Sequence, residues 1–302
     1  SGSTEISIDG VMASESDLKI GMVVNVGVDD DANADFTRGT LLTVTADHVV
    51  TGPVTSLSPL RVLSQEISVV SSTRLEDVPG NNISGLDIGD VVEVSGLPDS
   101  TGVIRASLIE YKASGAPVWQ LRGSISSVSS PVLFVGNQRI NTAGATFSDC
   151  GTLAAGQLVE VKANAVNSFS DGDTLSASSL ECLQKGLERP DSGKTSQGSF
   201  EGFVDTLTSA TQFTVNGQTV QISASTQFED GNASDVLVGA HLEAEGTLDS
   251  NGVLNAAKIR FREARVRIEA ALAAADVQPD SSVTLLGIDV FDLPTTRDDS
   301  AI

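Results

Sequence analysis

The fold of this chain is decided by residues 199–262, which open with the run Phe200-Glu201-Gly202-Phe203-Val204-Asp205-Thr206-Leu207. A second run follows, Phe213-Thr214-Val215-Asn216-Gly217-Gln218-Thr219-Val220-Gln221-Ile222. Apolar and polar residues that alternate between turn residues are typical of strands with one buried face, and Asn-Gly is the strongest short hairpin signal. The sequence therefore predicts a first strand followed by a two-stranded hairpin.

Three further runs complete this unit. A link begins at Phe228, a glycine-centred strand extends over Val236-Leu237-Val238-Gly239-Ala240-His241-Leu242-Glu243-Ala244-Glu245-Gly246, and a closing strand follows Gly252. Several short strands in so short a segment indicate a small barrel or sandwich. The fold class that we expect is therefore all-β, built from small five-stranded units.

The unit recurs along the chain. Its central glycine appears as Gly21, Gly89, Gly156 and Gly239, each inside a strand with the same apolar pattern. The first strand recurs at residues 52–57 and 121–128, and again at 266–272, where a hairpin at 284–291 follows it. A tandem repeat is thus the organising principle of the sequence.

The two ends each hold half a unit. Residues 1–47 contain a lead-in, the Gly21 strand and a closing strand, whereas residues 264–302 contain a first strand and a hairpin. A polar, turn-rich stretch separates two of the copies and is expected to be a flexible linker. The predicted division is a second half-repeat at 1–47, whole repeats at 48–116, 117–185 and 199–263, a linker at 186–198 and a first half-repeat at 264–302.

The pattern resembles a known family. Its marks are Phe213-x-Val215-Asn216-Gly217, Phe228-x-Asp230-Gly231, the Gly239 strand and Gly252-x-Leu254-x-Ala256. These are similar to tandem domains of unknown function in exported bacterial proteins, which form small OB-like β-barrels. The resemblance implies export, through a signal peptide that this chain does not contain, and an extracellular or cell-surface location. It implies no catalytic residues.

The composition bounds the partners. The net charge is −22, with acidic residues spread along the chain, which disfavours nucleic acid and anionic membrane surfaces because both require clustered Lys and Arg. No apolar run is long enough for a membrane span. The sequence therefore predicts no nucleic-acid partner and no membrane span.

The acidic segment offers a candidate metal site. Carboxylates of Asp29, Asp31 and Asp35 are closely spaced and could hold Ca²⁺, although the segment lacks the glycine and the terminal glutamate of an EF-hand loop. The alternative is a solvated loop between two strands. We expect no other cofactor.

The only two cysteines, Cys150 and Cys182, fall in one repeat, after its third strand and in its last strand. A disulfide is geometrically reasonable there and would imply an oxidising compartment; the alternative is two buried free thiols. His241 is expected to be a structural residue, and His48 lies at a strand end beside no evident partner. Since no acid–base pair or metal triad emerges, we expect no enzyme.

The complementary half-repeats suggest a function. A barrel that lacks strands exposes a backbone edge and half a core, and such an edge templates another chain. We therefore expect an extracellular structural subunit that polymerises head to tail into a filament, by strand complementation between the half-repeats. The residues that we expect at the contact are Ile6, Ile8, Val24, Val26, Ile268, Leu285, Ile288 and Val290. The alternatives are a ligand-binding or adhesive surface module cut from a longer exported protein, and a ring closed within one chain.

Overall fold

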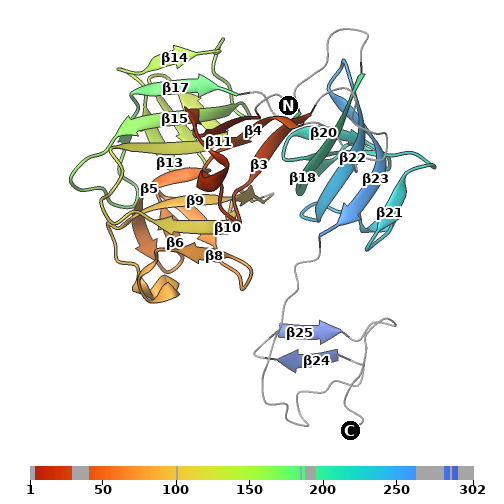
Figure 1. Cartoon of the computed structure of the whole chain (residues 1–302), viewed down its shortest axis with the longest axis horizontal. Helices are drawn as coiled ribbons and strands as arrows, with labels where there is room; N and C mark the ends of the chain where they lie inside the picture. The colour runs from red at the N-terminus through yellow and green to blue at the C-terminus, as the bar shows by residue number, and fades with distance from the viewer. Residues whose placement is uncertain are drawn as a thin grey trace. The chain divides into compact units, whose positions relative to one another are not determined.

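The protein is all-β. The computed structural model describes residues 4–28, 41–99, 101–183, 186–187, 195–262, 282–285 and 288–291, and in these ranges the only helices are four short 3-10 turns. They are η1 (Glu15–Asp17), η2 (Pro79–Asn81), η3 (Ile83–Gly85) and η4 (Ala233–Asp235). The chain divides into two compact units, Ser1–Arg262 and Glu263–Ile302 (Figure 1).

The strands of the third repeat pair in a closed order. They are β18 (Thr195–Leu207), β19 (Gln212–Val215), β20 (Gln218–Gln221), β21 (Gln227–Glu229), β22 (His241–Asp249) and β23 (Val253–Phe261). β18, β19 and β20 form an antiparallel run, β20 pairs with β23 in parallel, and β22 joins β23 back to β18. Five strands thus form a ring of pairings, and the short β21 adds to β23 in parallel.

The local sequence explains the hairpin of this repeat. Asn216 and Gly217 occupy the turn with φ angles of 43° and 82°. A two-residue turn with positive φ at both positions matches the twist of the flanking strands, and Asn-Gly is the pair that tolerates it best. The predicted hairpin is therefore confirmed.

The first two repeats follow the same plan. The first contains β5 (Val50–Leu57), β6 (Leu60–Val62), β7 (Gln65–Ser68), β8 (Arg74–Glu76), β9 (Val91–Pro98) and β10 (Ile104–Tyr111). The second contains β11 (Val118–Ser129), β12 (Val132–Val135), β13 (Gln138–Asn141), β14 (Thr146–Ser148), β15 (Leu158–Asn164), β16 (Leu175–Ser176) and β17 (Ser179–Cys182). The first ring is β5, β6, β7, β10 and β9, whereas in the second ring the last strand is split into β16 and β17.

The N-terminal residues form a smaller sheet of the same kind. Its strands are β1 (Glu5–Ile8), β2 (Val11–Met12), β3 (Val24–Val28) and β4 (Leu41–Ala46), in the order β2-β1-β4-β3. Val44 pairs with Ile6 on one side and Val26 on the other, as Ile259 pairs with β21 and β22 in the third repeat. A register shift also falls at the matching place in β3–β4, β9–β10 and β22–β23. This sheet, which we call the N-terminal half-repeat, therefore has the pairing of the link, fourth and fifth strands of a repeat.

One part of the expected linker is wrong. Residues 195–198 lie within β18 and pair with residues 246–249 of β22. Their polar composition suggested a loop, but backbone pairing does not need apolar side chains, and the long partner strand extends the ladder. Leu187, also placed in the linker, packs against the core of the third repeat, and its N–H donates to Oε1 of Gln218 at 3.0 Å.

The second unit contains an antiparallel hairpin of β24 (Ser282–Leu285) and β25 (Ile288–Phe291). Leu285 pairs with Ile288, the same spacing at which Val215 pairs with Gln218 in the third repeat. The strand expected at 266–272 lies outside the described residues.

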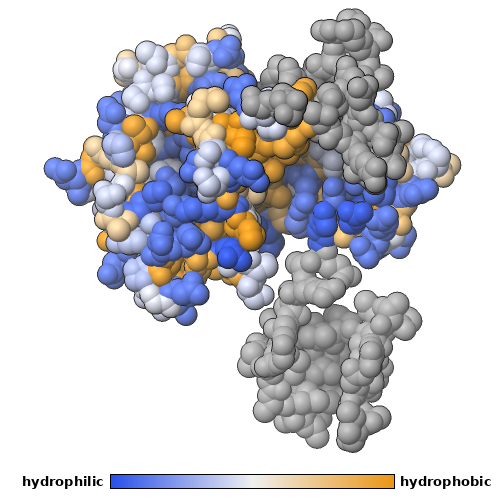
Figure 2. Space-filling model, in the orientation of Figure 1, coloured by the Kyte–Doolittle hydropathy of each residue, from blue (hydrophilic) through white to orange (hydrophobic). Residues whose placement is uncertain are grey.

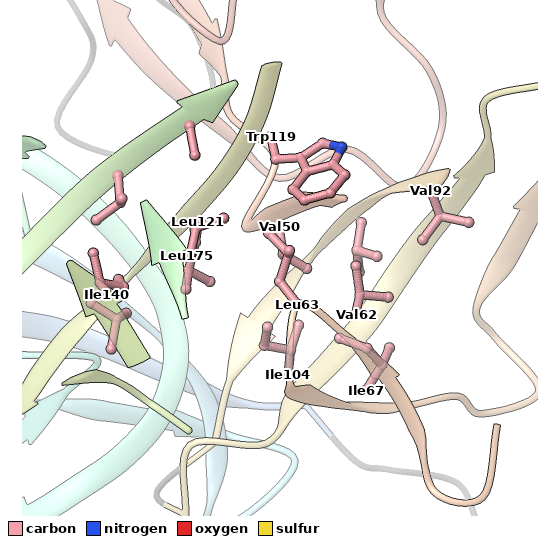
Figure 3. Close-up of a cluster of buried hydrophobic side chains, with 14 of the residues drawn as sticks. Val50, Val62, Leu63, Ile67, Val92, Ile104, Trp119, Leu121, Ile140 and Leu175 are labelled. Atoms are coloured by element: carbon pink, nitrogen blue, oxygen red, sulfur yellow. The ribbon is translucent and has the colours of Figure 1, made fainter. Parts of the chain in front are cut away.

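The apolar residues form two cores. One is continuous across the first and second repeats, and its members from both repeats lie close together in Figure 3. Trp119 is buried in it and meets the ring of Phe169 edge to face, with centroids 5.4 Å apart. The third repeat has a core of its own, built around Phe213 and Leu242.

Candidate assembly interface

The strand β3 has a free edge. Among the described residues it pairs with β4 alone and ends the sheet. The corresponding strands of the complete repeats, β9, β15 and β22, each pair on both sides. An edge strand presents unpaired N–H and C=O groups that another strand can pair with. The missing neighbour is the first strand of the repeat.

The side chains of β3 are also less covered than those of the corresponding strands. Val24 and Val26 are 42% and 51% exposed. Their equivalents in the three complete repeats are all fully buried, at 0%, and they are Val92, Val94, Val159, Val161, Leu242 and Ala244. Leu41 on β4 is 38% exposed, whereas its equivalents Ala106 and Ala256 are 4% and 6%. Residues that form the core of a complete repeat therefore face solvent here.

Val24, Val26 and Leu41 together make up what we call the open core face. In Figure 2, hydrophobic side chains gather where Figure 1 draws β3 and β4. An unpaired strand edge beside apolar side chains is a surface to which a further strand can add. The unpaired edge and two of the three exposed residues, Val24 and Val26, lie on the same strand, β3.

The N-terminal half-repeat is seated on the first repeat by polar contacts. Lys19 Nζ lies 2.9 Å from Glu110 Oε2, and Ser107 Oγ donates to the carbonyl oxygen of Gly21 at 2.6 Å. A Cβ at Gly21 would lie 2.9 Å from the Ser107 carbonyl oxygen, and the φ of Gly21 is +103°. Glycine is therefore required at this point both for conformation and for close approach.

A buried pair adds a second anchor. Asp9 follows β1, and its Oδ2 lies 2.7 Å from Nδ1 of His48, whose own backbone N–H donates to Asp9 Oδ1 at 2.9 Å. Gln120 of the second repeat donates to the same Oδ1 at 3.1 Å. Asp9 thus connects the half-repeat to the segment before β5 and to β11. The expectation that His48 lacks a partner is wrong, because its partner lies 39 residues away in the sequence.

The charges around His48 act on its protonation. Burial of the imidazole disfavours its charged form, but the hydrogen bond to Asp9 and the negative charges of Asp9, Glu93 and Glu110 prevail and raise the pKa of His48. Burial likewise opposes the charge of Asp9, yet the contacts with His48 and Gln120 lower the pKa of that carboxyl. The pair is therefore an ion pair over a wider pH range than isolated groups would allow.

Two carboxylates lie opposite each other nearby. Glu93 and Glu110 are cross-strand partners on β9 and β10, and Lys112 Nζ lies 3.0 Å from an oxygen of each. Burial of Glu110 works against its charge, but its hydrogen bonds with Lys19 and Lys112 lower its pKa. Lys19 from the half-repeat therefore adds a second positive charge, beside Lys112, to the like-charge pair of the first repeat.

Cys150 and Cys182 form a disulfide, with Cα atoms 5.0 Å apart. Cys150 follows β14 and Cys182 ends β17, the two strands that pair in parallel at the end of the second repeat. The bridge ties the link of this repeat to its last strand. The third repeat contains no cysteine.

The remaining candidate residues are distributed as follows. Ile6 and Ile8 lie in β1 and are half-buried, and Leu285, Ile288 and Val290 lie in β24 and β25. Ile268 and the proposed calcium ligands Asp29, Asp31 and Asp35 lie outside the described residues. His241 is on β22, with Nε2 at 3.0 Å from Glu201 Oε1 and its ring stacked on Phe203 at 4.5 Å.

The described residues were compared with the requirements of a metal centre and of a membrane-spanning helix, and they meet neither. They contain no group of three or more His, Cys, Asp or Glu placed to hold a metal ion. They also contain no helix long and apolar enough to cross a membrane.

Comparison with protein families identifies the repeat. Three segments, residues 51–110, 122–181 and 201–260, match the model described as "Domain of unknown function (DUF5666)". These segments make up more than half of the chain, which therefore belongs to this family as a tandem array of its domain. Searches of the curated proteins and of the solved structures each gave no match.

Proposed function

We propose that this protein is an extracellular structural subunit that polymerises head to tail, its C-terminal half-repeat completing the N-terminal half-repeat of the next subunit. One observation carries the proposal: Val24 and Val26 are 42% and 51% exposed at positions where all three complete repeats have buried residues. Removing such apolar surface from water is favourable, and each fully buried valine contributes roughly 1.5–3 kcal/mol.

The strand order supports the nature of the donor. Each complete repeat is best interpreted as a small OB-like barrel, whose first three strands precede the link and whose last two follow it. The N-terminal half-repeat has the link and the last two strands. The hairpin β24–β25 has the register of the second and third strands. The two parts are complementary halves of one barrel.

The symmetry of this contact favours a filament. Donor and acceptor are different surfaces of the same chain, so the contact is heterologous, and a heterologous contact that does not close on itself propagates. The family resemblance to exported proteins and the disulfide between Cys150 and Cys182 support an extracellular setting. A structural disulfide persists in such oxidising surroundings.

The experiment compares two separate variants with the intact chain: a deletion of residues 264–302, and the point variant Val26→Asp. Val11→Asp is the matched control, since Val11 is 68% exposed and lies on β2, away from β3. Light scattering and electron microscopy should show polymers for the intact chain and for Val11→Asp, and single subunits for the other two.

Filaments that still form in the deletion variant would contradict the proposal. An intact chain that scatters as a compact monomer would instead indicate ring closure within one chain. A native protein whose mass exceeds that of this sequence would favour the surface-module alternative.

A further inference from the structure

We infer that the donor strand is residues 265–272 of a second copy, and that it adds antiparallel to the free edge of β3 with Ile268 opposite Val26 and Ala270 opposite Val24. This inference rests on the proposed function and specifies its contact residue by residue.

The donor assignment comes from a pattern shared by the first strands. Each has an apolar residue, a small residue two positions on and a second apolar residue two positions further. In the complete repeats these triplets are Val50, Gly52 and Val54; Leu121, Gly123 and Ile125; and Phe200, Gly202 and Val204. The segment before β24 repeats the pattern with Ile268, Ala270 and Leu272. Alanine replaces glycine as the small residue. A Cβ at Gly52, Gly123 or Gly202 would lie 2.6 to 2.7 Å from a side chain of the adjoining hairpin, so that side chain must shift to admit Ala270.

The register is the same in all three complete repeats. The first apolar residue pairs with the residue of the fourth strand that is equivalent to Val26, as Phe200 pairs with Ala244. The small residue pairs with the residue that is equivalent to Val24, as Gly202 pairs with Leu242. The pairs Val50–Val94 and Gly52–Val92, and Leu121–Val161 and Gly123–Val159, repeat this arrangement. Because β3 shares the register of β22 towards its other neighbour, the same rule places Ile268 opposite Val26.

A donor strand in this register would supply the apolar side chains that cover the equivalents of Val24 and Val26 in the complete repeats. Val50 and Leu121 are fully buried in their repeats, and so are the residues that they oppose. Ile268 and Leu272 are apolar and two positions either side of Ala270, so one face of the strand carries both. That face covers Val24 and Val26.

One pair of opposite charges fits the same register. The ladder between first and fourth strands continues outwards to Val118–Asn164 in the second repeat and to Gln197–Thr247 in the third. The residues at the corresponding sequence positions are Arg265 on the donor and Asp29 on the acceptor. Arg267 corresponds to Gly27 in this antiparallel register, so the inferred charge pair is Arg265 with Asp29 alone.

The test is disulfide trapping between two variants on the outer face of the contact. Asn25 is exposed and pairs, in the inferred register, with Glu269. The variant Asn25→Cys is mixed with the variant Glu269→Cys. In two parallel mixtures it is combined instead with Arg267→Cys or with Ala271→Cys, whose positions are two residues before and two residues after Glu269 on the same face of the inferred strand. Because a disulfide needs Cα atoms within about 7 Å, the pair with Glu269→Cys should give about tenfold more cross-linked dimer than the offset pairs.

A charge reversal gives the second measurement. Asp29→Arg and Arg265→Asp should each weaken polymerisation, and the double variant should restore it. Preferential trapping by an offset pair would overturn the register while leaving strand complementation in place. Loss of every cross-link together with monomeric scattering of the intact chain would overturn the proposed function itself, and failure of the double variant to recover would overturn the Arg265–Asp29 contact.

Discussion

The N-terminal half-repeat and the third repeat contain the same three strands in the same register, yet they differ in what those strands bury. In both, a parallel link strand and an antiparallel fourth strand flank the last strand, with a register shift at the matching position. Ala244 is fully buried in the third repeat, whereas its equivalent Val26 is 51% exposed. The difference is the first strand, β18, which has no counterpart beside β3 among the described residues.

This comparison separates two contributions to the fold. Pairing follows from turns and alternation within a short segment, so it forms in half a repeat. Burial requires a layer of side chains from a strand that lies elsewhere in the sequence. A half-repeat is therefore ordered in its backbone pairing while its core stays exposed on one side.

The largest effect should come from placing a charge on each of the two equivalent core positions. Ala244→Asp buries a carboxylate without a partner and should destabilise the third repeat by more than about 4 kcal/mol. Val26→Asp leaves its carboxylate in solvent and should cost the isolated subunit less than about 1 kcal/mol. Denaturant unfolding followed by amide exchange in β23 and β4 measures both. Equal losses at the two positions would contradict the difference in burial.

The next effect concerns the disulfide, which only the second repeat possesses. Replacing Cys150 and Cys182 by serine removes a crosslink between residues 32 positions apart, and loop-closure entropy puts the loss at about 3 to 4 kcal/mol. Amide exchange should accelerate in β14 and β17 and stay unchanged in β21 and β23. Unchanged exchange in β17 would show that the packing around Leu180 suffices without the bridge.

The smallest effect is the pH dependence of the stability that the Asp9–His48 pair gives to the N-terminal half-repeat. The pKa of His48 is raised above its ordinary value of 6.5, so the charged Asp9–His48 pair contributes fully below that value. The contribution is lost as the pH rises through the raised pKa of His48. The pKa of Asp9 is lowered below 3.8, so at the acid end the contribution is lost only as the pH falls through that lowered pKa.

We therefore expect the protection factors of the amides in β1 and β4, which compare their exchange with that of the unfolded chain at the same pH, to be highest between these limits and to fall at alkaline pH. A hydrogen bond to a charged group is worth about 1.5–3 kcal/mol, which sets the size of the change. His48→Gln should remove the alkaline dependence. His241→Gln serves as the control because His241 pairs with Glu201 in the third repeat, away from Asp9. A pH profile unchanged in His48→Gln would assign the dependence to other groups, of which Glu93, Glu110, Lys19 and Lys112 lie nearest.

The sequence predicted the strands and their repetition well, because each strand has its own alternation and each turn its own residues. Asn216-Gly217 alone fixes one hairpin. The recurring glycines mark the period, but their expected place inside the fourth strands is wrong: Gly21, Gly89, Gly156 and Gly239 have positive φ and lie in the turns before β3, β9, β15 and β22. Prediction from the sequence failed where a residue's main contact is with a residue far away in the sequence. His48 appeared isolated, yet Asp9 lies against it, and residues 195–198 appeared to be linker, yet they pair with β22.

The sequence by itself determined that this protein contains a tandem array of short-stranded units, since turn chemistry and period-two alternation are local properties. Only the tertiary structure decided which of those apolar residues are buried. Val24 and Val26 have the same alternation as their equivalents in the complete repeats, and nothing local distinguishes them. Burial depends on a neighbouring strand brought in by the fold, and beside β3 that place is free among the described residues.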